Sequence, residues 1–203
     1  AGPIMGRYIP ESTKRALEIL KSEGHFLAIC TGRLHAMGEG FMHELGFQNM
    51  VADGGNSLTL DGEFLGIKPL DTQACIDVIE ECERLGVVWA ISFDDSRRRW
   101  TRYANYDALV HDSYMETVVD PELDYRSIEC FYKVYVICSP EEEGRIASLS
   151  KVPTARFSPY AVFVEPVDKG EGIKRCMAHL GASIEDVVVF GDGSNDVCMF
   201  LPE

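Results

Sequence analysis

The feature that most constrains the fold is an alternation of helical segments with short, continuously apolar runs. A helical pattern that starts at Ser12 and stops at Gly24 leads into the apolar run Phe26–Cys30. A second helical pattern then leads into the run Met50–Ala52. Short apolar runs are typical of strands buried on both faces of a parallel sheet, and helices are the usual crossovers between such strands. The pattern predicts an α/β fold built on a parallel sheet.

This pattern is interrupted in the middle of the chain and returns at its end, where the helical segment Gly170–Leu180 precedes the apolar run Val187–Phe190. Between the two parts, apolar runs flank turn signals such as Asp94-Asp95-Ser96, which indicates strands paired in hairpins. We therefore predict a split core domain, residues 1–66 and 166–203, and an inserted α+β domain, residues 67–165. In the insert we expect helices at 71–84, 107–118 and 140–149, and strands at 87–93, 99–103, 132–137, 155–158 and 161–165.

The charge of the chain limits its partners. The sequence has 33 acidic and 19 basic residues, which gives a formal net charge of −14. Because such a surface repels phosphate backbones and anionic lipid, we expect neither nucleic-acid nor membrane binding. No apolar run approaches the roughly 20 residues that a membrane span needs. An acidic protein that handles a phosphate usually needs a cation to make the site locally positive.

The cysteines and the N-terminal residues indicate in which compartment of the cell the protein is located. The sequence has seven cysteines, an odd number, and no CxxC pair. Most lie in apolar stretches, which predicts reduced core cysteines in a cytoplasmic protein. The segment Ala1–Met5 lacks the basic and apolar regions of a secretory signal. Because the chain does not begin with Met, we expect that residues ahead of Ala1 were removed or left out.

Polar residues follow the ends of predicted strands, where open α/β sheets place their ligands. In Thr31-Gly32-Arg33, a hydroxyl and free backbone N–H groups could hold a phosphoryl oxygen at a helix start. A capping Thr before a flexible Gly has the same pattern. In Asp168-Lys169-Gly170, the lysine could neutralise a phosphate, or it could be a solvated surface residue.

The third polar cluster is the loop Gly191-Asp192-Gly193-Ser194-Asn195-Asp196, which follows the last apolar run. Two carboxylates and an amide on a glycine-rich loop supply the oxygen ligands that hard cations prefer. The glycines let the backbone turn tightly and approach a ligand closely. An ordinary Asp/Gly/Asn turn is the alternative interpretation. The cluster predicts a metal site.

Taken together, the three clusters resemble motifs II, III and IV of the haloacid dehalogenase (HAD) superfamily of phosphatases. The segment Leu27–Arg33 resembles the second motif, Lys169 with Gly170 the third, and Gly191–Asp196 the fourth. The segment Asp53–Asn56 lies where the related Cof-type (subfamily IIB) hydrolases carry an Asn-Gly signature, and the insert falls where that branch has its α/β cap. The resemblance spans essentially the whole chain. It implies a split Rossmann-like core with an inserted α+β cap domain.

The resemblance also implies an activity. It points to a Mg²⁺-dependent phosphatase that hydrolyses a small phosphorylated metabolite, such as a sugar phosphate, through an aspartyl-phosphate intermediate. Thr31 and the backbone N–H of Gly32 would bind the phosphoryl group. Lys169 would neutralise that group and the nucleophile.

For the metal, the resemblance implies Asp192 as the Mg²⁺ ligand. Asn195 would bind phosphate or position Lys169. Asp196 would lie behind the metal, where it would orient Lys169 or a metal-bound water.

The chain departs from the family's pattern at both ends. The first motif is an Asp-x-Asp-Gly strand end that carries the nucleophile and the general acid/base. We expect it just before residues such as Pro3–Ser12, where it is missing, and neither Asp53 nor Asp61 lies in the right loop. Its strand would lie between the strands that end at Cys30 and Phe190, and the family's last core strand is missing too. Either residues of the natural protein were left out, which we favour, or the chain is a truncated piece.

Two alternatives from other classes stay open. A non-catalytic phosphate-binding HAD-like protein would keep the fold without the nucleophile, and a phosphomutase of the same superfamily would return phosphate to a second sugar position. Arg97 to Arg99 could contact an anionic substrate, but a solvated hairpin tip is the favoured interpretation, so they are not counted as site residues. The sequence leaves the substrate and the oligomeric state open.

Overall fold

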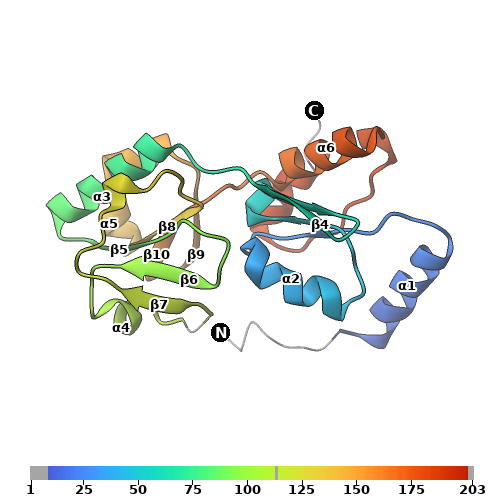
Figure 1. Cartoon of the computed structure of the whole chain (residues 1–203), viewed down its shortest axis with the longest axis horizontal. Helices are drawn as coiled ribbons and strands as arrows, with labels where there is room; N and C mark the ends of the chain where they lie inside the picture. The colour runs from blue at the N-terminus through green and yellow to red at the C-terminus, as the bar shows by residue number, and fades with distance from the viewer. Residues whose placement is uncertain (1–8, 113, 201–203) are drawn as a thin grey trace.

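The computed structural model describes residues 9–112 and 114–200. These residues contain a four-stranded and a six-stranded sheet, which Figure 1 shows as two lobes. We call the lobe of the four-stranded sheet the core lobe and that of the six-stranded sheet the cap lobe. Helix α6 (Lys169–Leu180) contacts the four-stranded sheet, although the cap lobe separates the two in the sequence. Segments from the two ends of the chain therefore share the core lobe.

The four-stranded sheet has the order β1-β2-β3-β4. The first two strands pair in parallel, with Ile29 opposite Met50, as the sequence predicted. The other pairs are antiparallel, and the hairpin that joins the last two strands was not predicted. It turns at Asp61 and Gly62, where φ is 49° and 80°. The strands are β1 (Ile29–Cys30), β2 (Met50–Ala52), β3 (Ser57–Leu60) and β4 (Glu63–Ile67).

Two helices cover this sheet from opposite sides, α6 on one and α2 (His35–Glu44) on the other (Figure 1). A glycine at position 172 lets α6 lie close to β2, because a Cβ there would be 2.6 Å from Val51 Cγ1. The first helix, α1 (Glu11–Ser22), forms as predicted but has no buried residue. The apolar side chains that form buried clusters in the core lobe are Met42, Met50, Val51, Ala52, Leu58, Leu60 and Cys176.

The six-stranded sheet has the order β7-β6-β5-β8-β10-β9. Its pairs are antiparallel except β6 and β7, which run in parallel. The predicted hairpin around residues 94–96 is present as the pair β5 and β6. The strands are β5 (Val88–Ser92), β6 (Arg98–Thr101), β7 (Glu116–Val119), β8 (Lys133–Ile137), β9 (Thr154–Ser158) and β10 (Ala161–Val164).

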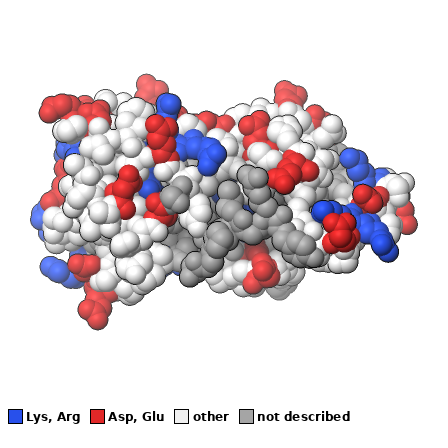
Figure 2. All heavy atoms as spheres, turned by 90° about the horizontal axis from the view of Figure 1, so that it is seen from below, with Lys and Arg blue, Asp and Glu red and all other residues white. Residues whose placement is uncertain are grey.

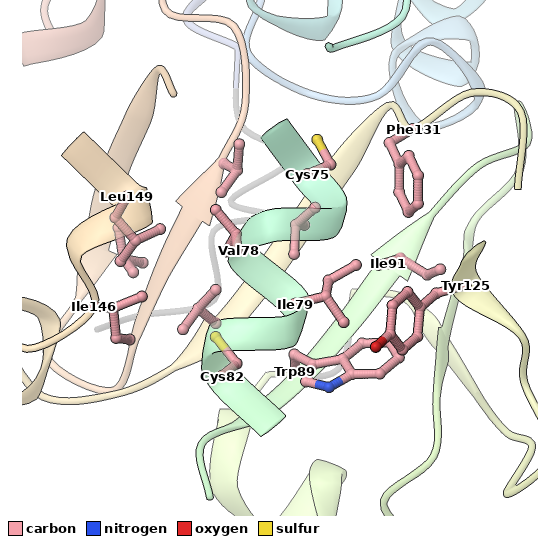
Figure 3. Packing of buried hydrophobic residues seen from close by; sticks show 14 of the residues in the cluster. Cys75, Val78, Ile79, Cys82, Trp89, Ile91, Tyr125, Phe131, Ile146 and Leu149 are labelled. Carbon is pink, nitrogen blue, oxygen red and sulfur yellow. The ribbon is translucent and has the colours of Figure 1, made fainter. Parts of the chain in front are cut away.

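Helix α3 (Thr72–Leu85) covers one face of the six-stranded sheet and forms the largest hydrophobic core described (Figure 3). Its apolar positions recur every three or four residues and place Cys75, Val78, Ile79 and Cys82 on one side. In Figure 3 this side of the helix lies between Ile146 and Leu149 on one flank and the rings of Trp89 and Tyr125 on the other. The two rings meet edge to face, with centroids 5.3 Å apart.

Two predicted helices of the insert are shorter in the structure. The helix expected at 107–118 covers only Tyr106–Val110 (α4), and the prediction for the remainder was wrong. His111 has a φ of 56°, which ends the helix, and Glu116–Val119 pairs with β6 as a strand. The helix expected at 140–149 is split into α5 (Pro140–Glu143) and a 3₁₀ turn, η3 (Ala147–Lys151). The other 3₁₀ turns are η1 (Asp53–Gly55), η2 (Tyr125–Ser127), η4 (Ile184–Asp186) and η5 (Ser194–Met199).

Two predicted strands of the core lobe are short or absent. The run Phe26–Cys30 pairs only at Ile29 and Cys30, and Val187–Phe190 forms no strand. The side chains of Val188 and Phe190 are 78% and 84% exposed. An apolar run forms a strand only where a neighbouring backbone accepts its hydrogen bonds, and no described strand lies beside Val187–Phe190. The first motif was expected just before residues such as Pro3–Ser12, and that position lies outside the described residues.

The domain boundaries at 66/67 and 165/166 stay a prediction; β4 runs to Ile67, one residue past the first of them. All seven cysteines are free, as expected. Within residues 9–112 and 114–200, no helix is long and apolar enough to cross a membrane. On the face shown in Figure 2, acidic and basic side chains are interspersed.

We predict that the cap-lobe core depends on the side chain of Ile79. Replacing Ile79 by Ala removes a fully buried side chain and should lower the free energy of unfolding by about 2–5 kcal/mol. Gln73→Ala, at an exposed position of the same helix, is the matched control and should change it by less than about 0.5 kcal/mol. Urea unfolding followed by circular dichroism measures both. Equal effects of the two substitutions would contradict the packing described for α3.

Candidate active site

A cavity of about 1020 Å³ lies between the core lobe and the cap lobe. Its core-lobe wall comes from the loop after β1, the start of α6 and the loop at 191–196. Its cap-lobe wall comes from one face of the six-stranded sheet, opposite the face that α3 covers. The residues predicted for the site all line this cavity; they are Thr31, Gly32, Lys169, Asp192, Asn195 and Asp196.

The loop after β1 is fixed by the backbone of the next strand. The N–H of Thr31 donates to the carbonyl of Val51 (2.8 Å), and the carbonyl of Thr31 accepts from the N–H of Gly54 (3.2 Å). The Thr31 hydroxyl oxygen accepts from the N–H of Arg33 (3.2 Å), so its proton remains available to donate into the cavity. The loop is therefore held in place before any ligand binds.

Gly32 lies beside the loop at 191–196. A Cβ at this position would be 3.3 Å from Asn195 Nδ2, so the two loops touch at that point. Gly32 and Asn195 were predicted to belong to one site only because the order of the motifs resembles that of the family. The contact shows how closely the two loops approach, because a side chain at residue 32 would require the amide of Asn195 to shift by a few tenths of an ångström.

Lys169 and Asp196 form a buried ion pair. Lys169 Nζ donates to Asp196 Oδ1 at 2.5 Å. The other carboxylate oxygen accepts from the backbone N–H groups of Asp192 (3.1 Å) and Gly193 (2.9 Å). The hydrogen bond from Lys169, and next the N–H of Gly193, hold the pKa of Asp196 below its ordinary value. Both oxygens of Asp196 are therefore engaged, with Lys169 on one side and the glycine-rich loop on the other.

Lys169 is the first residue of α6, where a cation is opposed by the positive end of the helix. Its side chain is only 5% exposed. Asp168 caps the helix by accepting the N–H of Glu171 at 2.9 Å. The carboxylate of Asp196 offsets the unfavourable placement of the lysine and aims its ammonium at the cavity.

Asp192 differs from Asp196 in its surroundings. It is exposed at the edge of the cavity, and its carboxylate makes no hydrogen bond or ion pair with another described residue. A free carboxylate beside a phosphate-sized space suits a hard cation such as Mg²⁺. Within residues 9–112 and 114–200, no cluster of three or more His, Cys, Asp and Glu could hold a metal ion. Asp192 can therefore supply one ligand, and the engaged oxygens of Asp196 favour the positioning of Lys169 over the orientation of a metal-bound water.

The sequence did not predict the cap-lobe wall. Lys133 and Glu165 form an ion pair there, and both are more than nine-tenths buried. Burial lowers the pKa of Lys133, but the charge of Glu165 outweighs it and raises the pKa above the ordinary value. Lys133 and Tyr135 on β8, and Phe163 on β10 with Glu165 directly after it, alternate with residues that face α3. That alternation is the sequence signal that could have identified this wall.

Arg99 also lines the cavity, yet it is neither solvated nor free to bind an anion. Its side chain is 1% exposed, and its guanidinium donates to both oxygens of Asp112 at 2.9 and 2.8 Å. It also donates to Thr117 and Asp107. These bonds join β6 to β7 and to the segment between them. The solvated hairpin tip expected for residues 97–99 is therefore wrong for Arg99, whose role is to hold the cap lobe together.

Comparison with known proteins shows the family. Residues 5–201 match the haloacid dehalogenase-like hydrolase family. The chain is 24% identical over 200 residues to YkrA of Bacillus subtilis strain 168, whose name assigns it provisionally to the phosphatases; the match covers 94% of this chain and 75% of YkrA.

Solved structures share the fold. A hypothetical protein from Geobacillus kaustophilus HTA426 is 27% identical, with a TM-score of 0.78 over 96% of this chain and 77% of that one. The HAD subclass IIB sugar phosphatase BT4131 is 22% identical, with a TM-score of 0.71 over 96% of this chain and 77% of its own. These matches confirm the α/β fold class and the resemblance to Cof-type hydrolases predicted from the motifs. The chain belongs to the haloacid dehalogenase-like hydrolase family.

Proposed function

We propose that this hydrolase is a Mg²⁺-dependent phosphatase that acts on a small phosphorylated metabolite, such as a sugar phosphate. The observation that carries the proposal is the convergence on one cavity of a hydroxyl (Thr31), an ammonium (Lys169) and a free carboxylate (Asp192). In an acidic chain, a phosphate-binding site needs a local cation. The fold relationship to a named sugar phosphatase supports the same substrate class.

Each residue has a defined task in this proposal. The Thr31 hydroxyl and the N–H of Gly32 bind phosphoryl oxygens, while Lys169 neutralises the charge that develops on them. Asp196 keeps the ammonium of Lys169 in place, which avoids reorganisation during the reaction. Asn195, next to Gly32, closes the phosphate site from the other loop. Bound at Asp192, Mg²⁺ would screen the negative charge of the phosphoryl group.

The chemistry that we propose is covalent, with an aspartyl-phosphate formed and then hydrolysed by water. Neither Asp53 nor Asp61 can be the attacking carboxylate, because neither lines the cavity. The nucleophile is therefore not assigned to a described residue. The cavity volume suits a small leaving group in addition to the phosphate. We also keep a cytoplasmic location as a prediction, on the basis of the free cysteines.

Asp192→Asn should abolish the metal-dependent hydrolysis of p-nitrophenyl phosphate, because an amide oxygen is a weak substitute for a carboxylate ligand. Release of p-nitrophenol with and without Mg²⁺ measures the effect. Asp186→Asn, an exposed aspartate outside the cavity, is the control for the charge change and should leave the rate unaltered. Undiminished Mg²⁺-stimulated turnover in Asp192→Asn would remove Asp192 from the metal site.

Lys169→Ala should lower kcat by about 10²-fold or more, since the ammonium acts on charge that develops in the transition state. Lys174→Ala, an exposed lysine of the same helix that does not line the cavity, is the matched control. Steady-state kinetics with p-nitrophenyl phosphate gives kcat and KM separately. A raised KM with unchanged kcat would mean that Lys169 stabilises the bound substrate and the transition state equally, which would contradict its proposed role.

Product analysis tests the two alternative functions. With a hexose monophosphate as the substrate, we expect free phosphate and the sugar. Transfer of phosphate to a second position of the sugar would indicate a phosphomutase. Binding of phosphate without turnover, by a chain in which Mg²⁺ and all the site residues are present, would indicate the non-catalytic protein.

A further inference from the structure

Helix α2 begins directly after the loop Thr31-Gly32-Arg33, but it has no capping side chain of its own. Its N-cap position is Leu34, which cannot accept a hydrogen bond through its side chain. The first N–H groups of a helix have no partner within the helix, so they need acceptors from elsewhere. The N–H of His35 donates to Asp53 Oδ2 at 3.0 Å, and the N–H of Ala36 donates to Asp95 Oδ1 at 3.0 Å.

Asp95 comes from the other lobe. It lies in the turn between β5 and β6 of the cap lobe, 59 positions along the chain from Ala36. Its second oxygen, Oδ2, is 2.7 Å from Nδ1 of His35. One carboxylate therefore contacts the helix backbone with one oxygen and an imidazole with the other. Such a two-point contact fixes direction as well as distance.

His35 is held firmly enough to serve as the partner of Asp95. The residue is 5% exposed, and its ring stacks on Phe64 with centroids 3.9 Å apart. Burial lowers the pKa of His35, but the hydrogen bond and the charge of Asp95 outweigh it and raise the pKa above its ordinary value. Glu39 of the same helix and Asp53 of η1 add to this effect. The imidazole is therefore surrounded by carboxylates, and of the three only Asp95 belongs to the cap lobe.

The position of this contact links it to the cavity. The cavity lies between the two lobes, and α2 follows the loop that lines its core-lobe wall. If the cap lobe moved away, the N–H of Ala36 and the ring of His35 would both lose their partner. The contact thus favours the arrangement in which the cap-lobe wall faces Thr31 and Lys169.

We propose that Asp95 is a positioning residue that holds the cap lobe over the phosphoryl-binding loop by capping α2 and pairing with His35. The inference concerns the arrangement of the lobes and goes beyond the proposed function. The neighbouring Asp94 offers a matched comparison, because it lies in the same turn and bonds only within that turn, to Ser96 Oγ. An Asp→Asn change at either position removes the same charge, but only Asp95 contacts the core lobe.

The test compares Asp95→Asn with Asp94→Asn by small-angle X-ray scattering, hydrogen exchange and NMR titration of His35. In Asp95→Asn we expect the ratio of closed to open lobes to fall about 10- to 100-fold, the range for losing a hydrogen bond to a charged group. The radius of gyration should rise, and exchange should increase at the first turn of α2 and at the β5–β6 turn but not in β8. The pKa of His35 should fall, because the hydrogen bond and the negative charge of Asp95 that raise it are lost. Asp94→Asn should match the unaltered protein in every readout.

A second variant guards against a folding defect. His35→Gln removes the imidazole half of this contact from the core-lobe side, and the double variant with Asp95→Asn should open the lobes no further than Asp95→Asn alone. Faster exchange confined to α2, with an unchanged radius of gyration, would mean that Asp95 only caps a helix and would overturn the proposal. So would additive effects of the two substitutions. None of these measurements requires catalysis. A result that contradicts the role of Asp95 is therefore distinct from a result that contradicts the proposed phosphatase activity.

Discussion

The buried pair of Lys169 and Asp196 is the interaction on which the site depends. Asp196 binds the lysine with one oxygen and two N–H groups of the glycine-rich loop with the other, so one side chain fixes both the cation and the loop that carries Asp192. Losing one partner of such a pair leaves an uncompensated buried charge, at a cost of about 3–5 kcal/mol. A lysine at the positive end of a helix is a poor choice for stability alone. The arrangement agrees with the proposed role of Lys169 as a fixed cation beside a phosphate.

The cavity is a property of two lobes rather than of one. The core lobe supplies the groups proposed to bind the phosphate, and the cap lobe supplies a wall that carries the buried pair Lys133 and Glu165. The charge of Lys133 is neutralised by Glu165, and the charge of Arg99 is neutralised by Asp112. Of the other cations that line the cavity, Lys169 is paired with Asp196, whereas Arg33 on the core-lobe side and Arg97 on the cap-lobe side form no ion pair with a described residue. The carboxylate of Asp95 then connects the two walls through α2.

Much of the fold and of the candidate site followed from local patterns in the sequence. The parallel pair β1 and β2 follows from apolar runs, and Thr31, Lys169 and Asp192 from polar clusters after strand ends. The predictions that were wrong depended on tertiary contacts. Val187–Phe190 has the composition of a strand but no described neighbour to pair with, and Glu116–Val119 pairs with β6 although it was predicted to continue a helix. The partners of Arg99 and Asp95 lie at positions that no local pattern reveals, because only the folded chain brings them together.

The central claim is that Thr31, Gly32 and Lys169 form a phosphate site, and the position of a bound phosphate mimic tests it most directly. Crystals grown with Mg²⁺ and tungstate would locate the anion through the anomalous signal of tungsten. The account predicts a single strong peak within hydrogen-bond distance of Thr31 Oγ1, the N–H of Gly32 and Lys169 Nζ, with Lys169 still bonded to Asp196. Tungstate bound on the cap-lobe wall, with the groups around Lys169 free of it, would contradict the account.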